Sequence, residues 1–244
     1  MSTNVNPSGA RDAGSSLYIG ARRSLLPHGG KRVAKAVTAT LSKSQVRAVI
    51  GGASRSIALG VPLNRFVTVH WGALSVSERQ SFKATQELLR RARDWLRDHG
   101  AVVAWVWVRE TSPLEPEKGA HVHWLLHVPE RLRGAFLRRL RGWVMASKGN
   151  AMIYQARAIQ SRSVGDVGSE KRSPKTHRAN LRAVVAYMVK GMAVGDSKIA
   201  AEGLSGIWSA MGAEALKCES GGLVAGKRAG VSRRLRIDWR WDNP

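Results

Sequence analysis

Hydrophobic positions along the middle of the chain follow two periods, one typical of strands and one typical of helices. Residues 65–71 form a run of β-branched and aromatic side chains between Pro62 and Gly72, which predicts a strand. Apolar side chains then recur at helical spacing from Ser77, a residue suited to cap a helix, to about residue 99. The same patterns predict strands over residues 101–110, 120–128 and 151–160, and helices over residues 129–147 and 178–193.

The order of these elements predicts an α+β fold. The segment 101–110 is too apolar for a sheet covered on one side, so we expect it to be buried on both faces. A turn with Pro and Gly, residues 112–119, joins it to the strand 120–128. Strands adjacent in sequence usually pair as an antiparallel hairpin. We therefore predict an antiparallel sheet with helices packed against it.

The two ends of the chain lack this clear pattern. Residues 1 to about 35 mix Ser, Gly, Asn, Pro and Arg without an apolar period, which predicts a disordered basic arm. Residues 36–58 predict a helix interrupted by Gly51-Gly52, and we expect the ordered core to start at Arg65. The chain is accordingly divided into an N-terminal arm, a central domain and a basic C-terminal extension, over residues 1–60, 61–195 and 196–244.

Charge sets this chain apart from an ordinary globular protein. Its 244 residues include 40 Lys and Arg against 17 Asp and Glu, a net charge of +23, while its apolar fraction of 43% is ordinary. This excess favours nucleic acid as the partner. No stretch approaches the roughly 18 apolar residues of a membrane span. The single cysteine, Cys218, allows no disulfide within the chain, and we expect a cytoplasmic protein without a membrane partner.

A basic stretch near the C-terminus is a candidate contact for a DNA backbone. It runs from Gly226 to Arg236 and contains several cationic side chains in a short length of chain. Lys and Arg side chains that neutralise phosphates supply most of the non-specific affinity for nucleic acid. We expect DNA contacts from Lys227, Arg228, Arg233, Arg234 and Arg236.

The strand 120–128 carries several imidazoles on one face. His121, His123 and His127 are spaced by multiples of two residues, so their side chains point the same way. A single histidine in such a strand would most often be a core residue, but several buried imidazoles without partners cost a few kcal/mol in desolvation. A divalent cation relieves that cost, since imidazole is a common metal ligand. The pattern predicts a metal site at His121 and His123, with His127 as a further ligand or as an outer partner.

Two imidazoles alone do not complete a site for Mg²⁺ or Mn²⁺, which prefer oxygen. Glu110 ends the preceding predicted strand and is the nearest carboxylate with a defined position. If the register of the hairpin places its face beside His121 and His123, three ligands converge and leave open positions for water and a phosphate oxygen. Glu115 and Glu117 lie in the connecting turn and are weaker candidates.

The last predicted helix carries Tyr187 and Lys190 one turn apart, on the same side. An apolar stripe that includes Leu181, Val185 and Met188 is expected to face the sheet, which places Tyr187 at the edge of the buried face with its hydroxyl free. Taken alone, this pattern fits an edge tyrosine that anchors the helix and a solvated lysine. Beside a metal, however, a phenol and an ammonium are the groups needed to break a phosphodiester and retain its end covalently.

These three segments together resemble the ordered motifs of the HUH endonuclease superfamily. The resemblance covers residues 62–195 and rests on the upstream strand Phe66–Trp71, the pair His121 and His123, and the later pair Tyr187 and Lys190. Within the superfamily the chain resembles single-tyrosine initiators of rolling-circle replication from bacterial plasmids and phages. Two departures are the 11 residues between Glu110 and His121, which require a longer turn than in many relatives, and His70, where a small polar residue is common.

The resemblance implies a five-stranded antiparallel sheet of RRM-like topology with Mg²⁺ or Mn²⁺ on its central strands, and Glu110 as the third ligand. It implies an enzyme that nicks one strand of an origin, becomes joined through Tyr187 to the 5′ phosphate, and later rejoins the ends. Lys190 would position the metal or the phosphate. The implied partners are single-stranded DNA or an origin hairpin, together with a host helicase and polymerase.

Two alternatives remain open from the sequence. A transposase or a plasmid-mobilisation relaxase would use the same chemistry, and only mapping of the DNA site separates these from a replication initiator. A nucleic-acid-binding protein with an RRM-like sheet and no catalysis is the other, although no strand carries the Gly/aromatic signature of RNA-binding sheets.

Overall fold

The computed structural model describes residues 37–111, 119–148, 156–164, 174–193, 219 and 221–236, all within one compact unit that spans residues 35–244. The helices are α1 (Lys43–Ala58), α2 (Glu78–Asp98), α3 (Arg133–Ser147) and α4 (Pro174–Val189). The strands are β1 (Val37–Thr38), β2 (Arg65–His70), β3 (Trp105–Thr111), β4 (Ala120–Leu126), β5 (Ile159–Ser163), β6 (Val224–Ala225) and β7 (Ala229–Val231). None of the described helices is both long and apolar enough to cross a membrane.

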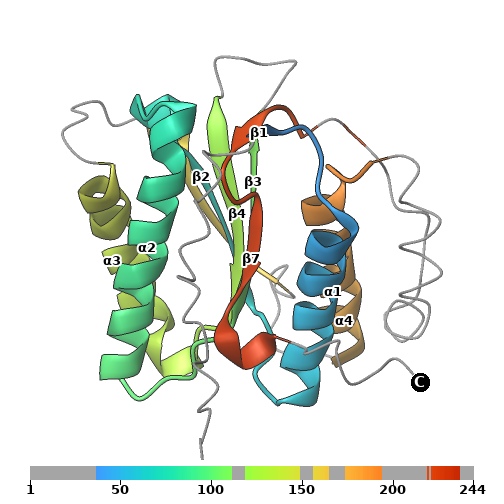
Figure 1. Cartoon of the computed structure of the whole chain (residues 1–244). Coiled ribbons are helices and arrows are strands. Elements are labelled where there is room, and N and C mark those ends of the chain that lie inside the picture. The colour runs from blue at the N-terminus through green and yellow to red at the C-terminus, as the bar shows by residue number, and fades with distance from the viewer. Residues whose placement is uncertain are drawn as a thin grey trace, which may run out of the picture. The chain divides into compact units, whose positions relative to one another are not determined.

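The fold is α+β, as the sequence predicted, and its main element is a five-stranded antiparallel sheet in the order β5-β2-β4-β3-β7. Strands β3 and β4 form the predicted hairpin near the centre of the sheet (Figure 1). The short strands β1 and β6 pair separately. The predicted strand 151–160 overlaps β5 only at its end, and residues 151–155 lie outside the described part of the chain.

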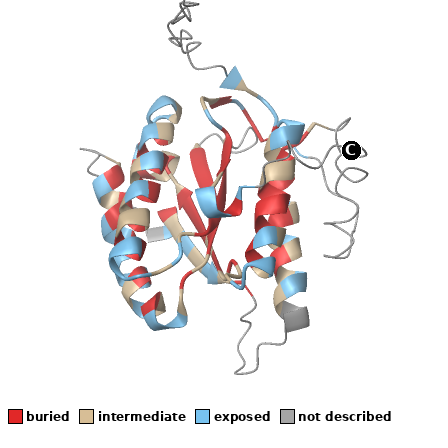
Figure 2. Cartoon of the chain, turned by 60° about the horizontal axis from the view of Figure 1, so that its bottom comes forward, coloured by how far each residue is buried: buried red, intermediate tan, exposed pale blue. Residues whose placement is uncertain are grey.

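Helices cover both faces of the sheet, and the strands between them are buried (Figure 2). Helices α2 and α3 cover one face, where the alternate side chains of β3 and β4 are bulky. That core contains Trp105, Trp107 and Trp124. Helices α1 and α4 cover the other face with a mainly aliphatic core. Helix α2 begins where predicted, since Ser77 and Gln80 form a capping box at its N-terminus.

Helix α1 extends the core beyond its predicted start at Arg65 and continues through Gly51-Gly52 without interruption. The second glycine has a packing role, because a Cβ atom on Gly52 would lie 2.9 Å from Val106 Cγ1 and 3.0 Å from Val231 Cγ1. The absence of a side chain there lets the helix approach β3 and β7 closely. A residue that weakens an isolated helix is thus needed for this helix to pack.

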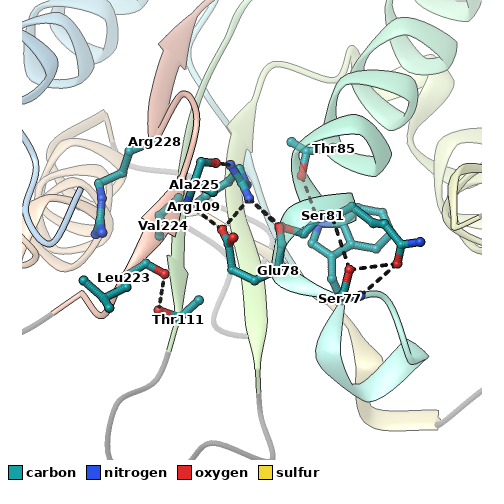
Figure 3. Close-up of polar contacts among 12 residues, drawn as sticks. Ser77, Glu78, Ser81, Thr85, Arg109, Thr111, Leu223, Val224, Ala225 and Arg228 are labelled. Carbon is teal, nitrogen blue, oxygen red and sulfur yellow. Dashed lines mark hydrogen bonds and ion pairs between the residues drawn. The ribbon is translucent and has the colours of Figure 1, made fainter. Parts of the chain in front are cut away.

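Two buried arginines join the C-terminal segment to the rest of the fold: Arg109 in β3, and Arg228 directly before β7 (Figure 3). Arg109 of β3 donates from Nη1 to the carbonyls of Ala225 and Lys227, at 2.9 and 3.2 Å. Arg228 donates to the carbonyls of Gly221, Gly222 and Thr38. Strand β7 therefore completes the sheet from a region that the sequence assigned to a C-terminal extension.

Candidate metal centre

Glu110, His121 and His123 converge on one point of the sheet. Glu110 is the register partner of His121, and Val108, two residues earlier on the same face of β3, is the partner of His123. The Nε2 atoms of His121 and His123 lie 3.5 and 3.6 Å from Oε2 of Glu110. One ligand atom from each residue lies within 4.8 Å of the others. The register on which the predicted three-ligand site depended is therefore present, and this buried group can hold a metal ion.

Two polar atoms of this group lack the hydrogen bonds that buried atoms usually make. Oε1 of Glu110 and Nε2 of His123 have no hydrogen-bond partner among the described residues, although both residues are almost fully buried. Leaving such atoms unsatisfied costs about 1–3 kcal/mol each. A divalent cation would satisfy both of them, and one carboxylate with two imidazoles suits several transition metals. The identity of the ion is not determined by these ligands.

Partners on the far side of each imidazole orient the candidate ligand atoms. Nδ1 of His121 lies 3.3 Å from the carbonyl of Gly119 and therefore donates its proton there. Nδ1 of His123 lies 3.0 Å from Oγ1 of Thr68. With a cation bound, a proton on Nδ1 would leave the lone pair of Nε2, the atom that faces Glu110, free to coordinate the ion. This arrangement is typical of histidines that bind metals through Nε2.

The local electrostatics favour the protonation states that a cation requires. Burial alone would raise the pKa of Glu110, but its contacts with His121 and His123 outweigh burial and lower the pKa to about 2. Burial lowers the pKa of His123, although Glu110 partly opposes this effect. An ionised carboxylate and a neutral imidazole are the forms that coordinate metals.

Tyr187 lies directly beside this group. Its ring centroid is 5.1 Å from that of His123 in an edge-on contact, and 6.4 Å from that of Phe66. Leu181 and Met188 of the same helix are fully buried, whereas Tyr187 is 45% exposed. The tyrosine therefore sits at the edge of the helix face, as its spacing predicted, with one side against the candidate metal group and the other accessible.

Lys190 is held over the tyrosine by a residue from the C-terminal segment. Its Nζ atom lies 4.6 Å from the centroid of the Tyr187 ring and 2.9 Å from Oε2 of Glu219. The main-chain N–H of Glu219 also donates to the carbonyl of Lys190. Burial would lower the pKa of Lys190, but the hydrogen bond that its ammonium donates to Glu219 and the negative charges nearby raise the pKa overall, so the ammonium remains charged.

Of the other histidines, His127 lies apart from the convergent group and His70 lies beside it. His127 follows the end of β4 and its Nδ1 lies 2.8 Å from the carbonyl of Pro62, so within the described chain it is not part of the group. His70 is the register partner of His121, and their ring centroids are 5.4 Å apart. Glu115 and Glu117 fall in a segment that the structure does not describe.

The predicted DNA contacts of the C-terminal stretch fall into two groups. Lys227, Arg233, Arg234 and Arg236 are exposed, and their role in DNA binding stays a prediction. Arg228 is fully buried, and its guanidinium donates to main-chain carbonyls. Its position gives it a role within the fold, between the C-terminal segment and β1.

Sequence reasoning missed Thr68 and Glu219. Thr68 lies in the predicted strand 65–71, two residues before His70, so the sequence shows that both side chains share a face. The sequence does not show that Thr68 pairs with His123. Glu219 lies 29 residues after Lys190, and no local pattern connects the two. Both contacts depend on how distant segments pair.

No protein-family model matches this chain, and neither a curated protein nor a solved structure is significantly similar to it. The comparisons therefore assign no family. Any functional conclusion rests on the chemistry of the site and on the motifs in the sequence.

Proposed function

We propose that this chain is a metal-dependent endonuclease and strand transferase that cleaves and rejoins single-stranded DNA through Tyr187. The observation that carries the proposal is the contact between the Tyr187 ring and His123, within a group in which Glu110, His121 and His123 can hold a metal. A net charge of +23 supports a polyanionic substrate. The five-stranded antiparallel sheet is compatible with the RRM-like core of HUH endonucleases.

The residues would divide the reaction as follows. Mg²⁺ or Mn²⁺ held by Glu110, His121 and His123 would polarise the scissile phosphate. The phenolic oxygen of Tyr187 attacks phosphorus, the bond from phosphorus to the 3′ oxygen breaks, and the 5′ phosphate stays on the tyrosine. The phenolic proton is lost to solvent, and the departing 3′ oxygen takes up a proton. Attack by a 3′ hydroxyl on the phosphotyrosine reverses these steps and rejoins the strand.

Lys190 has a supporting role in this scheme. A free phenol has a pKa of about 10 and is a weak nucleophile at neutral pH. The ammonium of Lys190 lies 4.6 Å from the ring centroid of Tyr187, where it would stabilise the negative charge that develops on the phosphate. The ammonium of Lys190 and the imidazole of His123 thus both contact the ring of Tyr187.

Within this class, the proposal narrows to an initiator of rolling-circle replication from a plasmid or phage. The initiator would act in the cytoplasm on an origin hairpin or single strand, with a host helicase and polymerase. The motif order of Phe66–Trp71, His121 and His123, then Tyr187 and Lys190 supports this reading. A transposase or a mobilisation relaxase would use the same residues, so mapping the nicked sequence to an origin, a transposon end or a transfer site decides among them.

Covalent capture of DNA tests the proposal. The full-length protein is mixed with a pool of labelled single-stranded DNA and Mn²⁺, and the products are separated on a denaturing gel. We expect a shifted band that EDTA prevents and that Tyr187→Phe abolishes. The other two tyrosines of the chain, Tyr18 and Tyr154, provide matched controls, because Tyr18→Phe and Tyr154→Phe should retain the band.

An adduct that persists in Tyr187→Phe would remove Tyr187 as the nucleophile. DNA binding without any adduct, across substrates that include hairpins, would favour the non-catalytic nucleic-acid-binding alternative. An adduct that resists EDTA would contradict the role given to the metal group.

A further inference from the structure

The edge strand β5 carries two polar side chains on the same face of the sheet as the metal group. Gln160 pairs with Thr68, and Thr68 pairs in turn with His123. Directly paired residues of neighbouring strands point to the same face, so Gln160 lies in the same row as His123. Arg162 lies in the next row, opposite Phe66.

Helices α1 and α4 lie mainly over the opposite end of this face, although Nδ1 of His177 in α4 lies 3.0 Å from the carbonyl of Val164, just after β5. Helix α1 packs on β3 and β7, and α4 packs on β3 and on α1. Gln160 and Arg162 are exposed, and Phe66 is half-buried beside them. Tyr187 is 45% exposed, so the tyrosine and both polar side chains of β5 are accessible.

The charge of Arg162 is not neutralised within the described chain. Its Nη2 atom lies 3.5 Å from Oε1 of Gln160, which is a neutral amide, and no described carboxylate forms an ion pair with it. The arginines of α2 differ in this respect, because Arg90 and Arg91 each lie 2.8 Å from Glu87. An accessible guanidinium with no carboxylate partner in the described part of the chain can bind an external anion.

The distance across the sheet suits a nucleotide chain. Neighbouring strands lie about 4.8 Å apart, so β5 is about 10 Å from β4. A strand of DNA with its scissile phosphate at the metal group would therefore bring an adjoining phosphate within reach of the long Arg162 side chain. The rival explanation is that Arg162 only prevents association of the sheet edge, a common use of charged residues on edge strands.

We propose that Gln160 and Arg162, the β5 strip, bind the backbone of the single-stranded DNA that adjoins the scissile phosphate. Arg162 contacts a phosphate, and Gln160 contacts the neighbouring sugar or base. This inference rests on the proposed function, because it is the metal group and Tyr187 that define where the scissile phosphate lies. It adds a direction to that function: the substrate leaves the site over β2 and β5.

Binding of a fluorescent single-stranded oligonucleotide to the full chain, in EDTA so that cleavage does not interfere, tests the strip. We expect Arg162→Ala to raise the Kd about fivefold and to reduce the slope of log K against log salt by about 0.7, the value for one phosphate contact on a single strand. Arg162→Lys should recover part of the affinity. Arg139→Ala is the matched control, because Arg139 is an exposed arginine on α3, on the other side of the sheet, and its Kd should change less than about twofold.

A second measurement locates the contact. In an oligonucleotide that the wild type captures, single phosphates near the nick are replaced one at a time by neutral methylphosphonates. We expect the effect of Arg162→Ala to vanish at one phosphate adjoining the nick and to persist at the others. An equal Kd for Arg162→Ala and wild type, or an effect spread evenly over all phosphates, would overturn the proposal.

The two proposals fail in different ways. If the wild-type protein forms no covalent adduct, the proposed nuclease is refuted. If the wild type forms the adduct but Arg162→Ala binds DNA with an unchanged Kd, only the role of the β5 strip is refuted. Thermal unfolding of Arg162→Ala should match the wild type, since the side chain is exposed at an edge.

Discussion

Arg109 and Glu110 are consecutive residues of β3 that carry opposite charges to opposite faces of the sheet. Arg109 is 1% exposed and Glu110 is 3% exposed. The terminal nitrogens of Arg109 donate to Ala225, Lys227, Ser81 and the carboxylate of Glu78. The carboxylate of Glu110 lies beside the imidazoles of His121 and His123, and its Oε1 has no hydrogen-bond partner among the described residues.

The difference separates a charge bonded within the fold from a charge that is open to a ligand. The Nη atoms of Arg109 find partners in the protein that join β3 to α2 and to the C-terminal segment (Figure 3), although its Nε has none among the described residues. Burial lowers the pKa of Arg109 to about 10, so it remains charged at neutral pH beside Glu78. Around Glu110 the polar atoms face one another without completing their bonds. Equal burial therefore does not imply an equal role.

The largest expected effect is on stability, from Arg109→Met. The change removes a donor from three main-chain carbonyls and from the Glu78 carboxylate, and we expect a loss of about 3 kcal/mol in the free energy of unfolding. Chemical denaturation measures it. Arg138→Met, at an exposed arginine of α3, is the control and should change stability by less than about 0.5 kcal/mol. Equal effects of the two changes would erase the contrast between the two charges.

The next effect concerns metal binding, from Glu110→Gln. At Mn²⁺ near 100 times its Kd, the wild type should gain about 2.7 kcal/mol of stability, and this gain should disappear in the variant. Without metal, the variant should be less stable than the wild type at neutral pH, because the neutral amide lacks the favourable contacts of the ionised carboxylate with His121 and His123. Thermal unfolding with and without Mn²⁺ reads both quantities.

Glu130→Gln serves as the control for that experiment, since the Glu130 side chain is 68% exposed and lies outside the metal group. It should keep the full response to Mn²⁺. A response that survives in Glu110→Gln would mean that the ion binds elsewhere.

A smaller effect is expected from Thr68→Val, which keeps the side-chain shape but removes the oxygen that lies 3.0 Å from Nδ1 of His123. Loss of such an outer partner lowers metal affinity by roughly tenfold or somewhat more. Titration calorimetry with Mn²⁺ measures the affinity, and Thr68→Ser should restore it. If valine and serine behave alike, Thr68 does not orient the imidazole.

The smallest effect is expected from Glu219→Gln, which removes the ion pair to Lys190 but keeps the main-chain bond between the two residues. The Glu219 side chain is 55% exposed, and exposed pairs contribute at most about 1 kcal/mol. The rate of adduct formation should therefore fall by less than about fivefold, with DNA binding unchanged. A larger loss in binding than in rate would assign Glu219 to the DNA interface.

Most elements of the central fold could be predicted because their signals are local. The alternation along residues 120–128 and the cap at Ser77 predict β4 and α2, both of which are confirmed. The α+β class followed from their order. The interruption predicted for helix α1 was wrong. Glycine weakens an isolated helix, but here Gly52 allows close packing on β3 and β7, and no local sequence pattern reveals that contact.

The candidate site divides in the same way. His121 and His123 share a face by parity alone, and that face was correctly predicted. The approach of Glu110 required the register of a hairpin whose turn is long, and the partners Thr68 and Glu219 required pairings across 55 and 29 residues. The burial of Arg228 could not be predicted either, because the sequence of a basic stretch does not distinguish a buried arginine from one that binds DNA.

The position of β7 has a consequence for how the molecule is made. A chain that has been synthesised only as far as residue 195 already holds the metal group, Tyr187 and Lys190, but the edge of β3 lacks its last strand. Open strand edges are prone to pair with other chains, so a fragment cut at that point would carry the candidate site on an aggregation-prone sheet. The closing strand arrives last, and with it Glu219 and the contacts that join the C-terminal segment to β3.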